Sequence, residues 1–153
     1  LWGVCYNIEE TTELDLGGQN LGGEIPSEIG NLINLSSLAL WGNQFTGTIP
    51  SEIGNLTNLT YLSLAYNDLT GEIPSSIGNL INITNLWLAQ NQLSGQIPPE
   101  LGNLINAVEI LLQGNQLSGE IPEEVCDLIE SNNLDISYLI GNPPMPDIIN
   151  TCD

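Results

Sequence analysis

A 24-residue period runs through most of this 153-residue chain and constrains its fold more than any other feature. Each copy carries two aliphatic residues, usually leucines, separated by one position. An asparagine, a glycine and an Ile-Pro pair then follow at fixed distances. Five copies fit the pattern LxxLxLxxNxLxGxIPxxIGNLxN, and a degraded sixth begins at Leu134. Self-similarity at this period indicates stacked structural repeats.

The chemistry of one repeat predicts a strand followed by a tight return. The LxxLxL stretch alternates with period two, so its leucines face one side of a β-strand. Because one repeat cannot bury its leucines alone, turns should stack about 4.8 Å apart as a parallel ladder. The asparagine can bond backbone groups of its own loop and of the adjacent turn. The glycine lets the backbone bend, and the proline fixes the turn. We interpret these positions as scaffold.

The repeat resembles the plant-type leucine-rich repeat of receptor-kinase ectodomains and polygalacturonase-inhibiting proteins, and similar arrays occur in bacterial surface proteins. The resemblance extends over residues 11 to about 130. Trp2-Gly3-Val4-Cys5 also resembles the end of that family's N-terminal cap, W-x-G-V-x-C, with one residue missing. The resemblance implies an α/β-type solenoid of five 24-residue repeats, with a parallel β-ladder on the concave face and a cap at each end. The expected division is a cap remnant at 1–10, repeats at 11–130, and a degenerate sixth repeat with the C-terminal cap at 131–153.

The charge balance excludes several classes of function. The chain has 19 Asp and Glu residues and no Lys, Arg or His. Affinity for nucleic acid and for anionic membrane surfaces comes from Lys and Arg, so neither is an expected partner. No apolar run approaches the roughly 18 residues of a membrane span, so membrane insertion is not expected. Without His or Lys, and without a recognised nucleophile–base pair, the chain is not expected to be an enzyme.

The three cysteines predict one disulfide. Cys126 and Cys152 bracket the C-terminal segment and are expected to bond there. A disulfide indicates an oxidising compartment, and therefore an extracellular or cell-surface location. Cys5 is left over; in the similar family the equivalent cysteine pairs with one just upstream, which this sequence lacks. The spacings are too wide and the ligand set too poor for a zinc site.

Function should lie in the strand positions that the pattern leaves free, because these face outward on the concave side. Aromatic residues concentrate there, and Trp and Tyr are enriched at binding hot spots. The predicted ligand-binding residues are Trp41, Tyr61, Tyr66, Trp87 and Leu111. The alternative is that parallel strands simply favour aromatic side chains. The set is bordered by acidic residues, which favours a neutral or cationic ligand; they are Glu13, Asp15, Glu109 and Asp135.

A second repeated column is apolar where the similar family usually has a polar residue. It contains Ile33, Thr57, Ile81, Ile105 and Ile129. If exposed, Ile33, Ile81 and Ile105 could mediate self-association into a homo-oligomer. The alternative is partial burial against the convex loops. Columns of glutamate on the loop side could be bridged by Ca²⁺, but no calcium motif is present, so a solvated acidic flank is favoured and no cofactor is predicted.

Three functional hypotheses follow. The leading one is an extracellular, non-catalytic recognition module that binds a protein or a polysaccharide on the concave face. The second is a self-assembling structural surface or filament protein, which could depend on Ca²⁺. The third, ranked lowest, is ice binding, which occurs in some plant relatives of this repeat. Ice binding would need a flat Thr-rich face, and the best column is irregular: Gly22, Thr46, Thr70, Ser94 and Ser118.

Overall fold

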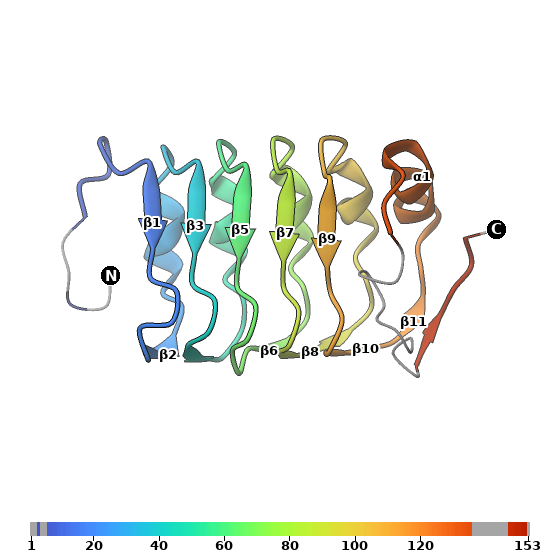
Figure 1. Cartoon of the computed structure of the whole chain (residues 1–153), viewed down its shortest axis with the longest axis horizontal. Coiled ribbons are helices and arrows are strands. Elements are labelled where there is room, and N and C mark those ends of the chain that lie inside the picture. Colours follow the sequence, from blue (N-terminus) through green and yellow to red (C-terminus); the bar gives the residue numbers. More distant parts are fainter. Residues whose placement is uncertain (1–2, 4–5, 136–146, 153) are drawn as a thin grey trace.

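The computed structural model describes residue 3, residues 6–135 and residues 147–152. Within these ranges the chain coils into an elongated solenoid, with strands along one side and short helices along the other (Figure 1). Cys5 and most of its surrounding cap motif lie outside the described residues. So do residues 136–146, in the degraded sixth repeat and the C-terminal cap.

A parallel five-stranded sheet forms one long side of the solenoid, in the order β1-β3-β5-β7-β9. Its strands are β1 (Glu13–Asp15), β3 (Ser37–Ala39), β5 (Tyr61–Ser63), β7 (Asn85–Trp87) and β9 (Glu109–Leu111). Neighbouring strands pair residues that are 24 apart in sequence, as in Leu14 with Leu38 and Leu62 with Leu86. The predicted parallel ladder is therefore confirmed.

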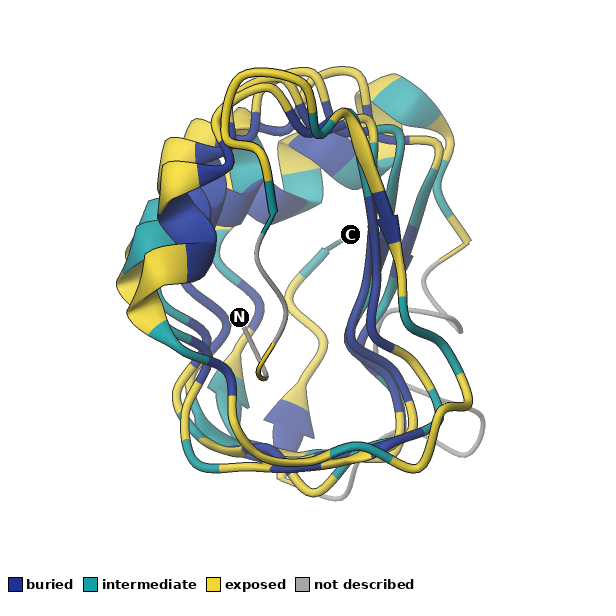
Figure 2. Cartoon of the chain, turned by 90° about the vertical axis from the view of Figure 1, so that its left-hand side faces the viewer, coloured by how far each residue is buried: buried dark blue, intermediate teal, exposed yellow. Residues whose placement is uncertain are grey.

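The leucines of the strands point into the coil and form its core. Leu38, Leu62 and Leu86 are fully buried, as is the second leucine of each pair from Leu40 onward. Viewed along the solenoid, buried residues line the inside of each turn, between the strands and the helices (Figure 2). Burying one such side chain contributes about 1.5–3 kcal/mol, so the stack of turns is held mainly by these contacts.

Short 3-10 helices return the chain on the opposite side. They are η1 (Ser27–Asn31), η2 (Ser51–Asn55), η3 (Ser75–Asn79) and η4 (Pro99–Asn103). Each follows the proline of an Ile-Pro pair, whose ring restrains φ near −65° and starts the turn. Each also brings one aliphatic residue into the core, such as Ile53 in η2.

A second set of strands connects the sheet to the helices. They are β2 (Gly22–Glu24), β4 (Gln44–Thr46), β6 (Thr70–Gly71), β8 (Gln92–Gly95) and β10 (Gln116–Leu117). These strands are also parallel, but they pair residues 22 apart, as in Gly22 with Gln44 and Thr70 with Gln92. The 24-residue columns on this side are therefore shifted by two residues at each paired step and do not lie directly beside one another.

The repeated asparagines form the polar ladder that the sequence predicts. The Oδ1 atom of Asn67 accepts a hydrogen bond from the backbone N–H of Phe45 in the preceding turn, at 3.0 Å. Its Nδ2 group donates to the backbone oxygens of Leu40 and Leu64, at 3.0 and 3.1 Å. Asn43, Asn91 and Asn115 make equivalent bonds. Each amide thus ties its own loop to the turn before it.

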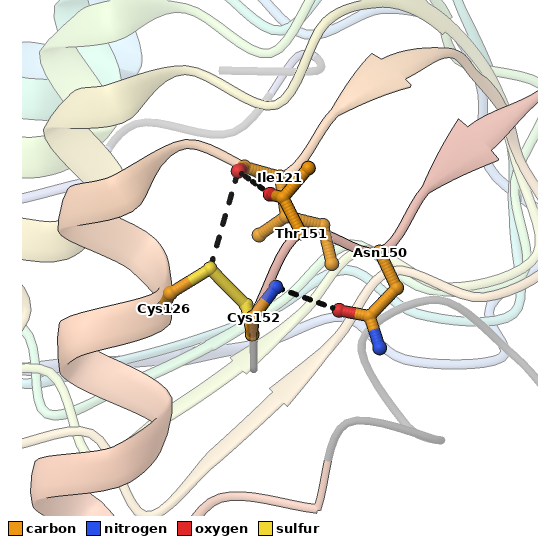
Figure 3. The surroundings of a disulfide bond; sticks show 5 residues. All are labelled: Ile121, Cys126, Asn150, Thr151 and Cys152. Atoms are coloured by element: carbon orange, nitrogen blue, oxygen red, sulfur yellow. Dashed lines mark hydrogen bonds between the residues drawn. A yellow bond between two sulfur atoms is a disulfide. The ribbon is translucent and has the colours of Figure 1, made fainter.

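A longer helix and a short strand pair close the C-terminal end. Helix α1 (Glu123–Asn132) stacks on η4, and β12 (Ile148–Ile149) pairs in parallel with β11 (Gly119–Glu120). The predicted disulfide is present and joins Cys126 of α1 to Cys152 (Figure 3). Beside it, the Thr151 hydroxyl donates to the backbone oxygen of Ile121 at 2.7 Å. The disulfide and this hydrogen bond fix the end of the chain to the last turn.

Candidate functional site

The sheet face, the outer surface of the five-stranded sheet with the segments that follow its strands, carries the predicted ligand-binding residues: Tyr61, Trp87 and Leu111 lie on strands, and Trp41 and Tyr66 follow β3 and β5. Strand register decides which of them are neighbours. Ser63 of β5 is in register with Trp87 of β7, and Trp87 is in register with Leu111 of β9. Tyr61 lies two residues before Ser63 on the same strand, so its side chain leaves the sheet on the same side.

Tyr61 and Trp87 are in direct contact. Their ring centroids are 5.2 Å apart and the ring planes are inclined by 74°, so the edge of one ring meets the face of the other. The indole Nε1–H of Trp87 donates to the Oε2 atom of Glu109 at 2.6 Å, and Asn85 Nδ2 donates to the same oxygen at 3.4 Å. The sequence marked Glu109 only as an acidic neighbour. The structure makes it the group that orients the Trp87 ring.

Trp41 lies over the turn that precedes it. Its side chain is 44% exposed, and its indole covers Gly17 so closely that a Cβ atom there would collide with the ring. The indole also lies beside Gly18. The role of Gly17 was not anticipated, because the pattern leaves its position free. The glycine provides the space in which the Trp41 ring can lie against the backbone.

Tyr66 is the most exposed of the predicted aromatic residues. Its side chain is 64% exposed, and its backbone has a φ of +57°, in the left-handed region that few bulky residues adopt. Within the part of the chain that the structure describes, neither Trp41 nor Tyr66 contacts another aromatic ring. The structure therefore joins Tyr61 with Trp87 and leaves the other two rings without an aromatic partner among the described residues. Leu111 is half-buried beside the joined pair.

Several residues expected to face outward on this sheet are buried instead. They are Ala39, Ser63, Ala65 and Ala89. These side chains are small, so their larger neighbours on the sheet can cover them. The hydroxyl of Ser63 is buried without a hydrogen-bond partner. Most buried polar atoms are hydrogen-bonded, so the unpaired Ser63 hydroxyl is an exception. It belongs to the residue in register with Trp87.

A cavity of about 370 Å³ opens next to Glu109, at the C-terminal edge of the sheet face. Its polar lining includes the amides of Asn85 and Asn133 and the carboxylates of Glu109 and Asp135. Its apolar lining includes Val108 and Leu134. A volume near the lower end of the range for ligand pockets suits a single side chain or a small group. Asn85 and Glu109 connect this cavity to the aromatic pair.

An apolar stripe runs along the edge of the solenoid where each 3-10 helix leads into the next strand. It consists of Ile33, Ile81, Ile105 and Val108, each more than half exposed. The alternative of partial burial is therefore wrong for Ile33, Ile81 and Ile105. Val108 was not anticipated; it occupies the position that is Ser36, Thr60 and Thr84 in earlier turns, where the hydroxyls donate to the preceding turn. The sequence could have indicated this residue, because an apolar valine replaces a hydroxyl-bearing residue in that column.

Two other kinds of feature are absent from the described residues. Among those residues, no three His, Cys, Asp or Glu side chains gather closely enough to hold a metal ion. None of the helices in the same ranges is long and apolar enough to cross a membrane.

Comparison with known proteins gives a consistent result. A family model described as "Leucine-rich repeat region" matches residues 13–138. The plant peptide hormone receptor RGFR1, solved in complex with RGF2, is 36% identical, with a TM-score of 0.77 over 91% of this chain. The PEPR1–AtPEP1 structure is 37% identical, with a TM-score of 0.76 over 81% of this chain. A plant ice-binding protein is 38% identical, with a TM-score of 0.69 over 76% of this chain and 38% of its own.

The chain is much shorter than the two receptors. It spans 23% of the RGFR1 chain and 17% of the PEPR1 chain. No curated protein sequence matches it.

Proposed function

The chain belongs to the leucine-rich-repeat family, and on that premise we propose that it is an extracellular recognition module that binds a polypeptide on its sheet face. As a leucine-rich repeat region it is a non-catalytic module. Its disulfide supports an oxidising, extracellular location. The similar receptor RGFR1 is described as a peptide hormone receptor and was solved with RGF2, which supports a polypeptide as the partner by analogy.

The observation that carries this proposal is the exposure of large aromatic side chains on the sheet face. Trp41 and Tyr66 are 44% and 64% exposed, and the half-buried pair of Tyr61 and Trp87 lies on the same face. Aromatic side chains offer large contact areas, and fixing them on binding costs little conformational entropy. They therefore supply most of the binding energy at many interfaces. On this chain Tyr61 and Trp87 stand on strands β5 and β7, and Trp41 and Tyr66 stand in the short segments that follow β3 and β5.

The test is a selection from a displayed random-peptide library, with a glycan array run in parallel. The wild type is compared with the double variant Trp41→Ala/Tyr66→Gly, and with Ile81→Ser as the matched control on the apolar stripe. We expect peptides to be enriched by the wild type and by Ile81→Ser but not by the double variant. Equal enrichment by all three proteins would remove Trp41 and Tyr66 from the binding surface and with them the observation that carries the proposal. Glycan binding without peptide enrichment would show that the partner is a polysaccharide and not a polypeptide.

Self-association through the apolar stripe is the second candidate function. The exposure of Ile33, Ile81 and Ile105 in one repeat column favours it. The net charge of −19 opposes it, because two copies repel each other until salt or a divalent cation screens them. Sedimentation velocity at high protein concentration, with and without Ca²⁺, tests it. Assembly that Ile81→Ser/Ile105→Ser abolishes would support it, and a monomer under both conditions would exclude it.

Ice binding receives less support, even though a plant ice-binding protein is among the similar structures. A regular array of hydroxyls would need Thr or Ser side chains to lie directly beside one another on adjacent turns. On the second set of strands, Thr70 is in register with Thr48 on one side but with Gln92 on the other. The offset of two residues at each paired step interrupts the hydroxyl column that the sequence suggested.

A further inference from the structure

Glu109 is an acidic group that its own chain cannot neutralise. The sequence has no Lys, Arg or His, so no basic side chain of this molecule can pair with any of its 19 carboxylates. The Oε2 atom of Glu109 accepts from Trp87 and Asn85. A carboxylate has about four lone-pair sites on its two oxygens, so it retains capacity to accept further hydrogen bonds. A basic side chain for this carboxylate must come from outside these 153 residues.

The neighbouring rings favour the same kind of ligand. In the T-shaped contact between Tyr61 and Trp87, the edge of one ring meets one face of the other, and both residues remain partly exposed to a third group. A cation over the face of Trp or Tyr is attracted by the negative potential of the ring. Because the Trp87 N–H donates to Glu109, ring and carboxylate keep a fixed relation to each other. The pair thus combines the two features that attract a flat organic cation.

The cavity beside Glu109 supplies room for the rest of such a side chain. Its volume is about 370 Å³, and it is lined by both amides and aliphatic groups. The Oδ1 atom of Asn85 already accepts from the Thr84 hydroxyl at 2.9 Å and retains one further lone pair. Val108 and Leu134 of the lining can pack against methylene groups.

We infer that Tyr61, Trp87, Glu109 and Asn85 form a binding site for an arginine side chain carried by a polypeptide partner. This inference rests on the proposed function and specifies the chemistry of that partner. Arginine fits better than lysine, because its planar guanidinium stacks on aromatic rings and donates two parallel hydrogen bonds to a carboxylate. A second copy of this chain cannot supply the ligand, since it contains no arginine or lysine.

The direct test is a titration with N-acetyl-arginine amide, followed by the indole N–H signals in a two-dimensional ¹⁵N NMR spectrum. Trp87→Phe identifies the Trp87 signal by removing it. N-acetyl-citrulline amide is the matched neutral probe, because citrulline has nearly the same shape as arginine but no charge. We expect the Trp87 signal to shift saturably with the arginine probe and to respond little to citrulline. The shift should weaken as NaCl is added, because salt screens the charge.

Two charge variants separate a local site from general attraction to an acidic protein. Glu109→Gln and Glu13→Gln each remove one negative charge at equivalent repeat positions, on β9 and on β1. We expect Glu109→Gln to weaken binding of the arginine probe by about threefold or more, as for a partly exposed ion pair, and Glu13→Gln to leave it unchanged. Equal weakening by both variants, or an equal response to arginine and citrulline, would overturn the inference.

The peptide selection distinguishes failure of this inference from failure of the proposed function. Peptides that depend on Trp41 and Tyr66 but show no enrichment in arginine would overturn the arginine site and leave the recognition module standing. If no peptide is enriched at all, the proposed function fails. A saturable, Glu109-dependent shift of Trp87 would still establish the cation site in that case.

Discussion

At the scale of single residues, Tyr66 combines backbone strain with little packing. Its φ of +57° is one that a residue with a Cβ atom adopts at a cost of about 1–2 kcal/mol. The equivalent positions in three other turns are Gly18, Gly42 and Gly114, which also have positive φ. The turn itself therefore does not need a side chain at this position. A strained residue with an exposed ring is better explained by a contact outside the chain than by the stability of the fold.

Replacing Tyr66 should separate stability from binding. We expect Tyr66→Gly to raise the free energy of unfolding by up to about 1 kcal/mol, because glycine adopts positive φ without steric cost. Tyr66→Ala retains the Cβ atom and the strain, so it should give no such gain. Urea denaturation measures both variants, and both should weaken binding of the selected peptides. If the Tyr66→Gly variant is no more stable than the Tyr66→Ala variant, this account is contradicted.

At the scale of elements, the stacking of the 3-10 helices depends on a glycine in each. A Cβ atom at Gly54 of η2 would collide with the backbone oxygen and the side chain of Ser76 in η3. Because backbone is involved, relief requires one helix to move away from the next. We expect Gly54→Ala to lower the free energy of unfolding by about 1–3 kcal/mol, as for overpacked cores.

Gly22→Ala is the control for this substitution. A Cβ atom at Gly22 would meet the backbone oxygen of Gln44 at 3.4 Å and the Cβ atom of Gln44 at 3.8 Å, both of which can be accommodated. Its urea denaturation midpoint should therefore stay close to that of the wild type. Equal losses in Gly22→Ala and Gly54→Ala would mean that close approach between turns is not what requires glycine in η2.

In the C-terminal cap a covalent bond joins the short last strand segment to helix α1. Strand β12 has only two residues, and the disulfide connects positions 26 apart in sequence. Loss of a disulfide that closes such a loop costs about 2–4 kcal/mol. We expect a reducing agent to lower the thermal midpoint of the wild type but not of the variant Cys126→Ser/Cys152→Ser. A wild type insensitive to reduction would show that the cap holds without the bond.

Sequence alone predicted the elements that repeat and missed the contacts that do not. The inward leucines, the asparagine ladder and the disulfide follow from spacing and side-chain chemistry, so they could be derived without coordinates. The position of Trp41 over Gly17 could not be derived, because it depends on which side chain a neighbouring turn lacks. The bond from Trp87 to Glu109 and the burial of Ser63 arise in the same way, from the particular residues that adjacent turns bring together.

At the scale of the whole molecule, the large negative net charge makes folding and ligand binding respond to salt in opposite directions. Added salt should stabilise the fold and weaken the binding of a cationic ligand. With 19 acidic residues and no basic side chains, the repulsion between turns has no internal compensation. Screening this repulsion stabilises the coil. The same screening weakens attraction of a cationic ligand to the sheet face. A solenoid with mixed charges would show neither effect as clearly, since its attractions and repulsions partly cancel.

The melting temperature of the chain should therefore rise as salt is added. Between about 0.01 M and 1 M NaCl the Debye length falls from roughly 30 Å to 3 Å, below the spacing of about 4.8 Å between stacked strands. Each kcal/mol gained raises the melting temperature of a chain this size by roughly 2–4 °C. CaCl₂ at equal ionic strength is the comparison: an equal rise indicates screening alone, and a larger rise indicates carboxylates that bind Ca²⁺. A melting temperature that does not change with NaCl would contradict the premise that uncompensated charge limits the stability of this fold.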